Sequence, residues 1–218
     1  MKYVLCMGSG HKWMPDVARL SGWEYGFRYD HSCQSDTPYM IDIRWKNYNW
    51  AKYIEKVKKY KPFMAMVADY EYPSQRKLMY QQIRELKPLV QRVMVCPKFI
   101  GAAAHIPSWC IIAVSVISDY AGFEPPPQEL RGREIHLLGG NFNRQADMMR
   151  KYNAYGEVVS LDSASHIMGA YHKRYFHNGR WIHLKERECS VQELAILSGK
   201  NIIAWFEAIK PDKQPSLF

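Results

Sequence analysis

Eight short apolar runs, most of them followed by a turn or a helical pattern, constrain the fold of this chain more than any other feature. Several runs are apolar at every position, as in Phe63–Ala68, which fits strands covered on both faces of a parallel sheet. The expected strands are Tyr3–Cys6, Tyr25–Tyr29, Tyr39–Ile43, Phe63–Ala68, Arg92–Cys96, Cys110–Val116, Glu134–Leu138 and Glu157–Leu161.

Segments between these runs carry the periodicity of amphipathic helices. Apolar residues recur at helical spacing from Trp50 to Val57, with Lys and Glu on the opposite face. Similar spacing predicts further helices over Leu78–Leu86 and Asn143–Tyr152, and a C-terminal helix after the capping box that begins at Ser190, with a break at Gly199.

Eight strands with interleaved helices in 218 residues predict an α/β fold, a reduced (β/α)8 TIM-type barrel; a doubly wound sheet is the alternative. The barrel is reduced because the connections around Gly101–Trp109 and Pro125–Pro127 are short for full helices. We expect a catalytic barrel over residues 1–184 and a C-terminal helical extension over residues 185–218, packed on the barrel.

Charge and aromatic content favour a nucleic-acid partner. The 30 Lys and Arg residues outnumber the 21 Asp and Glu residues, so the net charge is +9, which suits a polyanion. Aromatic residues also stand beside basic ones, a pairing that suits unpaired or flipped bases, although packing of long basic side chains produces it too. The predicted nucleic-acid contacts are Trp13, Arg44, Trp45, Lys173 and Arg174.

The five cysteines are scattered, so neither a zinc knuckle nor a redox pair is visible. This pattern predicts reduced thiols and a cytoplasmic protein. Met1–Cys6 is interpreted as a first strand rather than a signal peptide, and no apolar run is long enough to cross a membrane.

Three expected strands end in an aspartate: Asp42, Asp69 and Asp162. In a parallel α/β barrel the carboxyl ends of the strands form the active-site face, so these carboxylates should meet. Converging carboxylates can serve as nucleophile, proton shuttle and hydrogen-bond acceptor, or they can bind a divalent metal. The sequence pattern leaves both roles open.

Other polar residues that follow the expected strands are candidate substrate contacts. The Gly139-Gly140-Asn141 turn opens a helix, which suits an anion site, close approach to a flat ligand, or a plain strand-to-helix turn. The substrate-binding candidates are Ser9, His11, Lys98, Ser115, Gly139, Gly140 and Asn141. Four further histidines, of which we expect most to face solvent or nucleic acid, lie at His166, His172, His177 and His183.

From about Tyr3 to Ala170, the order of these strand-end motifs resembles the tRNA-guanine transglycosylase family and its DNA-acting 7-deazaguanine relatives. One matching segment resembles the family's strand whose terminal aspartate binds the guanine edge. It is Phe63–Ala68 followed by Asp69-Tyr70-Glu71-Tyr72-Pro73. The other matching segments are Met40-Ile41-Asp42, Ile135-His136-Leu137-Leu138-Gly139-Gly140 and Val158-Val159-Ser160-Leu161-Asp162-Ser163. Cys96-Pro97-Lys98 through Ser115 looks like compact, mostly phage or archaeal members.

The resemblance implies a role for each aspartate in replacing guanine by a free 7-deazaguanine base. Asp162 would be the nucleophile that attacks C1′, Asp42 the general acid and base, and Asp69 the acceptor of the guanine N1–H and amino group. No cofactor is needed, and the partners would be the nucleic acid and the free base, with DNA favoured over tRNA.

Two departures from the family pattern bear on this interpretation. The three clustered cysteines and histidine of the family's zinc site have no counterpart, which argues against a standard tRNA enzyme. Asp42 is followed by Ile43-Arg44-Trp45 in place of the Asp-Ser-Gly-Gly-Phe-Gln signature. The alternatives are a hydrolytic base-removing enzyme, a catalytically silent nucleic-acid-binding relative and, ranked lowest, a metal-dependent phosphoesterase.

Overall fold

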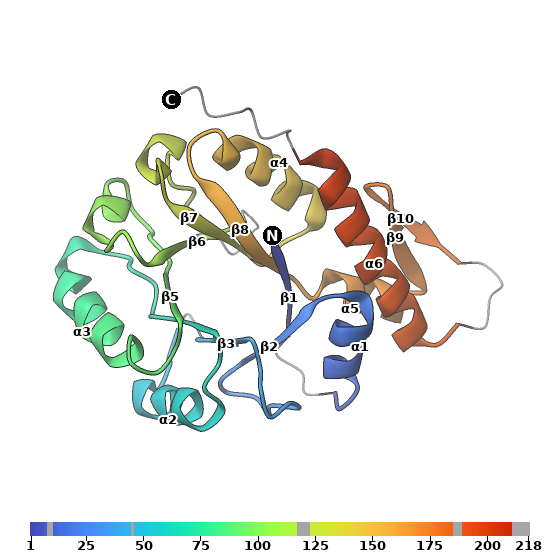
Figure 1. The fold of residues 1–218 in the computed structure, drawn as a ribbon, viewed down its shortest axis with the longest axis horizontal. Coiled ribbons are helices and arrows are strands. Elements are labelled where there is room, and N and C mark those ends of the chain that lie inside the picture. Colours follow the sequence, from blue (N-terminus) through green and yellow to red (C-terminus); the bar gives the residue numbers. More distant parts are fainter. Residues whose placement is uncertain (8–10, 45, 117–122, 185–188, 211–218) are drawn as a thin grey trace.

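Eight parallel strands close into a barrel in sequence order, as the apolar runs predict (Figure 1). The computed structural model describes residues 1–7, 11–44, 46–116, 123–184 and 189–210. Each strand pairs in parallel with the next, and β8 closes the barrel on β1. The strands are β1 (Lys2–Met7), β2 (Glu24–Arg28), β3 (Met40–Asp42), β4 (Met64–Met66), β5 (Arg92–Val95), β6 (Ile111–Ser115), β7 (Glu134–Leu138) and β8 (Glu157–Asp162).

In the described part of the chain, the outer layer has fewer helices than a full (β/α)8 barrel, as expected from the short connections. Single turns of 3₁₀ helix at Ala102–His105 and Pro127–Leu130 follow β5 and β6, and β2 leads into β3 without a helix. The α-helices between strands are α1 (Met14–Ser21), α2 (Trp50–Tyr60), α3 (Arg76–Leu86), preceded by a 3₁₀ turn at Pro73–Gln75, and α4 (Phe142–Asn153); α5 (Ser165–Tyr171) follows β8.

Gly26 on β2 lies in a closely packed part of the barrel wall. A Cβ at Gly26 would lie 3.0 Å from Val4 Cγ1 and 3.2 Å from Met40 Cβ, which belong to the strands on either side. A side chain at this position would require these neighbours to shift by a few tenths of an ångström in a core packed at native density.

The C-terminal helix α6 (Val191–Ile209) begins at the predicted capping box, in which Ser190 and Glu193 satisfy each other's backbone N–H groups. The predicted break at Gly199 is wrong, because α6 runs through this residue without interruption. A Cβ at Gly199 would lie 2.6 Å from Ser21 Cβ on α1. The glycine therefore allows two helices to approach closely.

A two-stranded antiparallel hairpin, β9 (Arg174–His177) and β10 (Arg180–His183), lies between α5 and α6 and was not predicted (Figure 1). Two polar contacts join it to α6: the Phe176 N–H donates to Ser198 Oγ at 3.1 Å, and Asn201 Nδ2 donates to the Phe176 carbonyl at 2.8 Å. Among the described residues, no helix is long and apolar enough to cross a membrane.

Candidate active site

Three aspartates gather at the carboxyl ends of the barrel strands, as the sequence predicts. Asp42 ends β3, Asp162 ends β8, and Asp69 follows β4 by three residues. Burial raises the pKa of Asp42 to about 8, with the negative charges of Asp162 and Asp69 adding to this rise. Arg28 and a backbone hydrogen bond oppose the rise but do not cancel it. Asp42 therefore keeps its proton at neutral pH.

The carboxylate of Asp162 is held by two donors on a single oxygen. Its Oδ1 lies 3.1 Å from His136 Nε2 and accepts a hydrogen bond of 2.9 Å from the Gly139 N–H. Gln145 Nε2 donates to the carbonyl oxygens of both Gly139 and Asp162, at 2.7 and 2.8 Å, which ties the two strand ends together. Among the described residues nothing donates to Oδ2, so this oxygen is available for chemistry.

His136 reaches Asp162 because of a β-bulge. The register between β7 and β8 shifts at Ile135 and His136, so that His136 pairs with Ser160 rather than with Val159. Its Nδ1 lies 2.8 Å from Ser160 Oγ, and the whole side chain is buried. With a hydrogen on Nε2, His136 donates to Asp162, and the Ser160 hydroxyl can rotate to suit Nδ1.

The carboxyl ends of the strands form the mouth of the barrel, and Asp69 lies in a second polar cluster on the side of this mouth opposite Asp162. Lys98 Nζ lies 3.3 Å from Asp69 Oδ2 and donates to Ser115 Oγ at 2.7 Å. Burial raises the pKa of Asp69, while the charge and hydrogen bond of Lys98 oppose the rise. The structure thus brings together Asp69, Lys98 and Ser115, which the sequence named separately.

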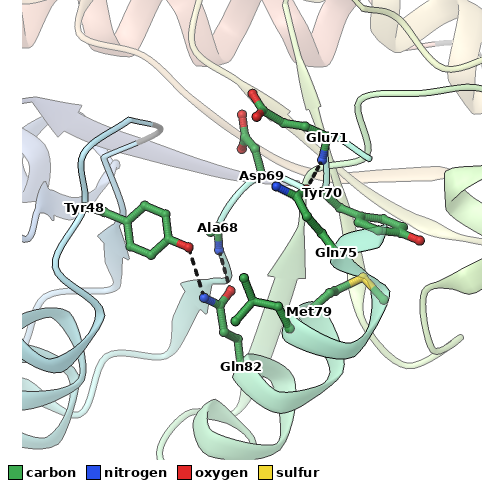
Figure 2. Close-up of a pocket in the computed structure, with 9 residues that line it drawn as sticks. Tyr48, Ala68, Asp69, Tyr70, Glu71, Gln75, Met79 and Gln82 are labelled. Atoms are coloured by element: carbon green, nitrogen blue, oxygen red, sulfur yellow. Dashed lines mark hydrogen bonds between the residues drawn. The ribbon is translucent and has the colours of Figure 1, made fainter. Parts of the chain in front are cut away.

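Glu71 adds a further carboxylate beside Asp69. Figure 2 shows both carboxylates pointing the same way, away from Gln82, and the charge of Glu71 raises the pKa of Asp69. Behind them lies a cavity of about 50 Å³. There Gln82 Oε1 accepts from the Ala68 N–H at 3.1 Å, which fixes the backbone just before Asp69.

The mouth also contains Cys6 and Arg28, which the sequence analysis did not select. Burial, then the charges of Asp42 and Asp162, raise the pKa of the Cys6 thiol well above its ordinary value. Arg28 donates to Asp30 through two bonds, Nε to Oδ1 at 2.6 Å and Nη2 to Oδ2 at 3.1 Å. Cys6 is therefore a protonated neighbour of the aspartates rather than a thiolate.

His11 and Trp13 belong to an aromatic cluster at the β1–α1 connection. Their rings stack with centroids 5.3 Å apart, and His11 Nε2 lies 3.0 Å from the hydroxyl of Tyr171 on α5. Among the described residues, no contact joins this cluster to the three aspartates. Arg44 is exposed two residues after Asp42. Two predicted contacts, Ser9 and Trp45, lie outside the described residues.

The Gly139-Gly140-Asn141 turn contributes both to the three-aspartate site and to a second cavity. Gly139 binds Asp162, whereas Gly140 and Asn141 line a separate cavity of about 350 Å³ that also reaches Arg174. The Asn141 side chain caps α4 by accepting from the Arg144 N–H at 2.9 Å. Lys173, the neighbour of Arg174, is exposed in the left-handed region at φ 54°.

Most of the four C-terminal histidines face solvent, as expected, and one is buried. His172, His177 and His183 are exposed as predicted, but His166 is fully buried. Its ring lies 4.5 Å from the Trp23 ring, and neither ring nitrogen has a hydrogen-bond partner. Burial lowers the pKa of His166 to about 3. The residue packs as a neutral aromatic ring because α5 turns it inward.

No group of three or more His, Cys, Asp or Glu residues in the described part of the chain is placed to hold a metal ion. The model of a family of unknown function, DUF6610, matches residues 18–202. This stretch is most of the chain and includes β2–β8 with all three aspartates. No curated protein matches the chain. The chain therefore belongs to the DUF6610 family of unknown function.

Proposed function

We propose that this chain is a base-exchange enzyme that replaces guanine in nucleic acid by a free 7-deazaguanine base, with DNA favoured over tRNA. The observation that carries the proposal is the contrast between two carboxylates at one barrel mouth. Asp42 holds a proton at neutral pH, and Asp162 presents a free oxygen from a fixed position. Chemistry at a glycosidic carbon needs such a pair, an acid and a nucleophile.

In the first half of the reaction Asp162 Oδ2 attacks C1′ of the target nucleotide. The C1′–N9 bond breaks, its electron pair passes to the departing guanine, and Asp42 supplies a proton to that base. The result is an ester between Asp162 and the sugar, free guanine, and an ionised Asp42.

In the second half a 7-deazaguanine base occupies the same pocket. Ionised Asp42 removes its N9 proton, N9 attacks C1′, and the ester bond to Asp162 breaks. Both aspartates return to their starting states, so the cycle needs no external oxidant or reductant.

Base selection falls to Asp69 and Lys98. A guanine edge offers N1–H and N2–H donors beside the O6 acceptor, and the carboxylate and ammonium groups provide the complementary partners 3.3 Å apart. A base that lacks these donors would leave Asp69 paired with Lys98 but without its hydrogen bonds to the base, and the loss of such a bond to a charged group costs about 1–3 kcal/mol. The arrangement therefore favours guanine and its 7-deaza analogues over adenine.

Base exchange can be measured with isotopically labelled guanine and, in parallel, with 7-deazaguanine. The protein is incubated with single-stranded DNA or with tRNA, and the nucleosides are then analysed by mass. The proposal predicts incorporation that Asp162→Asn reduces by about 10⁴-fold or more, because the substitution removes the nucleophile.

The matched control is Asp147→Asn, an exposed aspartate on α4 that pairs with Arg150 and lies outside the mouth. It should leave incorporation unchanged. Loss of guanine without incorporation would show a hydrolase instead. Nucleic-acid binding without either reaction would show a silent relative, and chelator-sensitive strand cleavage a phosphoesterase; each result would contradict base exchange.

A further inference from the structure

The cavity of about 350 Å³ beside the barrel mouth lies outside the three-aspartate site. Two loops that follow β7 and β8 form one side of it, and α5 with the β9–β10 hairpin forms the other. We propose that this cavity is a nucleotide subsite, which binds the phosphate and base that flank the target nucleotide. This inference rests on the proposed function for its ligand. Its lining includes Gly140, Asn141, Ser163, Met168, Arg174 and Trp181.

The position of the cavity fits a strand that passes through the catalytic mouth. Gly140 directly follows Gly139, whose N–H holds Asp162, and Ser163 directly follows Asp162 itself. Two residues that line the cavity are therefore the immediate sequence neighbours of Asp162 and of the glycine that holds it. In α/β barrels, the loops after the seventh and eighth strands frequently bind phosphate.

Unpaired donors on one side of the cavity match a phosphate. The Arg174 guanidinium and the His172 ring make no side-chain hydrogen bond or ion pair with any described residue. The backbone N–H groups of Gly140 and Asn141 also donate to no described residue. A guanidinium and backbone donors converging on one cavity are typical of phosphate contacts.

Apolar atoms on the other side match a base. The Trp181 ring packs directly against the α5 backbone at Gly169, where a Cβ would come within 2.3 Å of the ring. Met168, which is 46% exposed, continues this surface. Planar and polarisable side chains of this kind stack with bases of any sequence.

The α5 helix links the cavity to the aromatic cluster of His11, Trp13 and Tyr171. Tyr171 is 43% exposed and follows cavity residues Met168 and Gly169 on the same helix. The Tyr171 hydroxyl contacts His11, so the aromatic cluster lies at the C-terminal end of α5, the helix that lines the cavity. A strand leaving the subsite would meet these rings next.

The close contact at Gly140 explains the second glycine of the turn. A Cβ there would lie 2.5 Å from Val116 Cγ1, and its φ of 82° disfavours other residues. Glycine at this position therefore lets the loop pack directly against Val116 while it lines the cavity.

Binding without turnover tests the subsite independently of base exchange. Fluorescence anisotropy is measured with labelled single-stranded DNA and RNA of the same sequence, in the Asp162→Asn background, and dGMP is added as a competitor. We expect Arg174→Gln to weaken binding about tenfold and to reduce the salt dependence by about one phosphate contact. Arg180→Gln is the matched control, because Arg180 is exposed on the same hairpin but does not line the cavity.

A second variant, Met168→Trp, fills the cavity without a change of charge. It should weaken binding and leave the thermal unfolding midpoint near that of the parent, since Met168 is largely exposed. Equal losses with Arg174→Gln and Arg180→Gln, or full binding by Met168→Trp, would overturn the subsite. Competition by dGMP fits the proposal, because dGMP carries both a phosphate and a base. Arg174-dependent binding of dGMP with no Arg174-dependent binding of either oligonucleotide would show a mononucleotide site rather than a strand contact and would overturn the flanking-nucleotide proposal.

The two proposals can fail separately. If binding depends on Arg174 but the wild-type protein shows no base exchange, the subsite is supported and the transglycosylase function is contradicted. Base exchange that needs Asp162 but not Arg174, with binding unchanged, would do the reverse.

Discussion

His136 Nε2 lies 3.1 Å from Asp162 Oδ1, and both side chains are buried at the junction of β7 and β8. The bulge in the β7–β8 pairing brings the two residues into contact, and Ser160 holds the far nitrogen of the same ring. One oxygen of the proposed nucleophile is thus fixed by a chain of two buried side chains, His136 and Ser160. The other oxygen is left for the substrate.

Removal of His136 should therefore lower the rate of the chemical step more than substrate binding. We expect His136→Leu to reduce kcat by about 100-fold with little change in KM, because misplacement of a reacting group by about 1 Å has an effect of this size. Single-turnover base exchange gives the rate, and circular dichroism checks the fold.

Ser160→Ala provides the graded comparison for His136, since it removes only the contact to the far ring nitrogen. A smaller loss than that of His136→Leu supports a positioning role. A His136→Leu protein with full kcat would show that the bond to Asp162 does not orient the nucleophile.

The proton on Asp42 should give the reaction an alkaline limit. Its pKa of about 8 means that the acid needed for guanine departure disappears above that pH. We expect kcat/KM to fall about tenfold for each pH unit above about pH 8, with no such step left in Asp42→Asn, whose activity should be low at every pH. A wild-type profile that stays flat through about pH 9 would argue against Asp42 as the acid.

Buried His166 should make the protein acid-sensitive. Its pKa is about 3 in the fold, whereas an unfolded histidine titrates near its ordinary value of 6.5. Between these values the unfolded chain binds a proton that the folded chain does not, so stability falls as the pH drops below about 6.5.

His166→Leu should remove this penalty. Relative to wild type, the variant should gain about 2 kcal/mol in free energy of unfolding between about pH 7.5 and pH 5, measured by urea denaturation. His177→Gln, at an exposed position, should show no such gain. Parallel pH dependences in wild type and His166→Leu would contradict this account of the buried ring.

The contact between α1 and α6 predicts an inverted glycine effect. Gly→Ala in a helix interior ordinarily stabilises by about 1 kcal/mol, but a Cβ at Gly199 would lie 2.6 Å from Ser21 Cβ. We expect Gly199→Ala to destabilise the protein by about 1–3 kcal/mol in urea denaturation. Lys200→Ala, at the exposed next position, should be nearly neutral, and a stabilised Gly199→Ala protein would show that the helices can separate at no cost.

The barrel and its aspartates could be predicted because they depend on local patterns. Strands buried on both faces, as in Met64–Met66, are written as continuous apolar runs, and the carboxyl ends of parallel strands share one edge. Asp42, Asp69 and Asp162 follow from these two facts. The full α6 helix was only partly predicted, because the role of Gly199 depends on Ser21, far away in the sequence.

The supporting residues depend on pairings that the sequence does not display. His136 meets Asp162 through a bulge, and no local pattern indicates the register of β7 against β8. The β9–β10 hairpin is held by Ser198 and Asn201 of α6, so its stability comes from tertiary contacts. A lone polar residue within the apolar run Glu134–Leu138 was the one signal that His136 serves a purpose in the barrel.

The most direct test of the account is to trap the ester between Asp162 and the sugar. The protein is mixed with a labelled guanine-containing oligonucleotide, quenched in acid, separated on a denaturing gel and mapped by mass spectrometry of peptides. The account predicts a covalent adduct at Asp162 that 7-deazaguanine discharges and that Asp162→Asn does not form. Base exchange without any adduct, or an adduct that persists in Asp162→Asn, would contradict it.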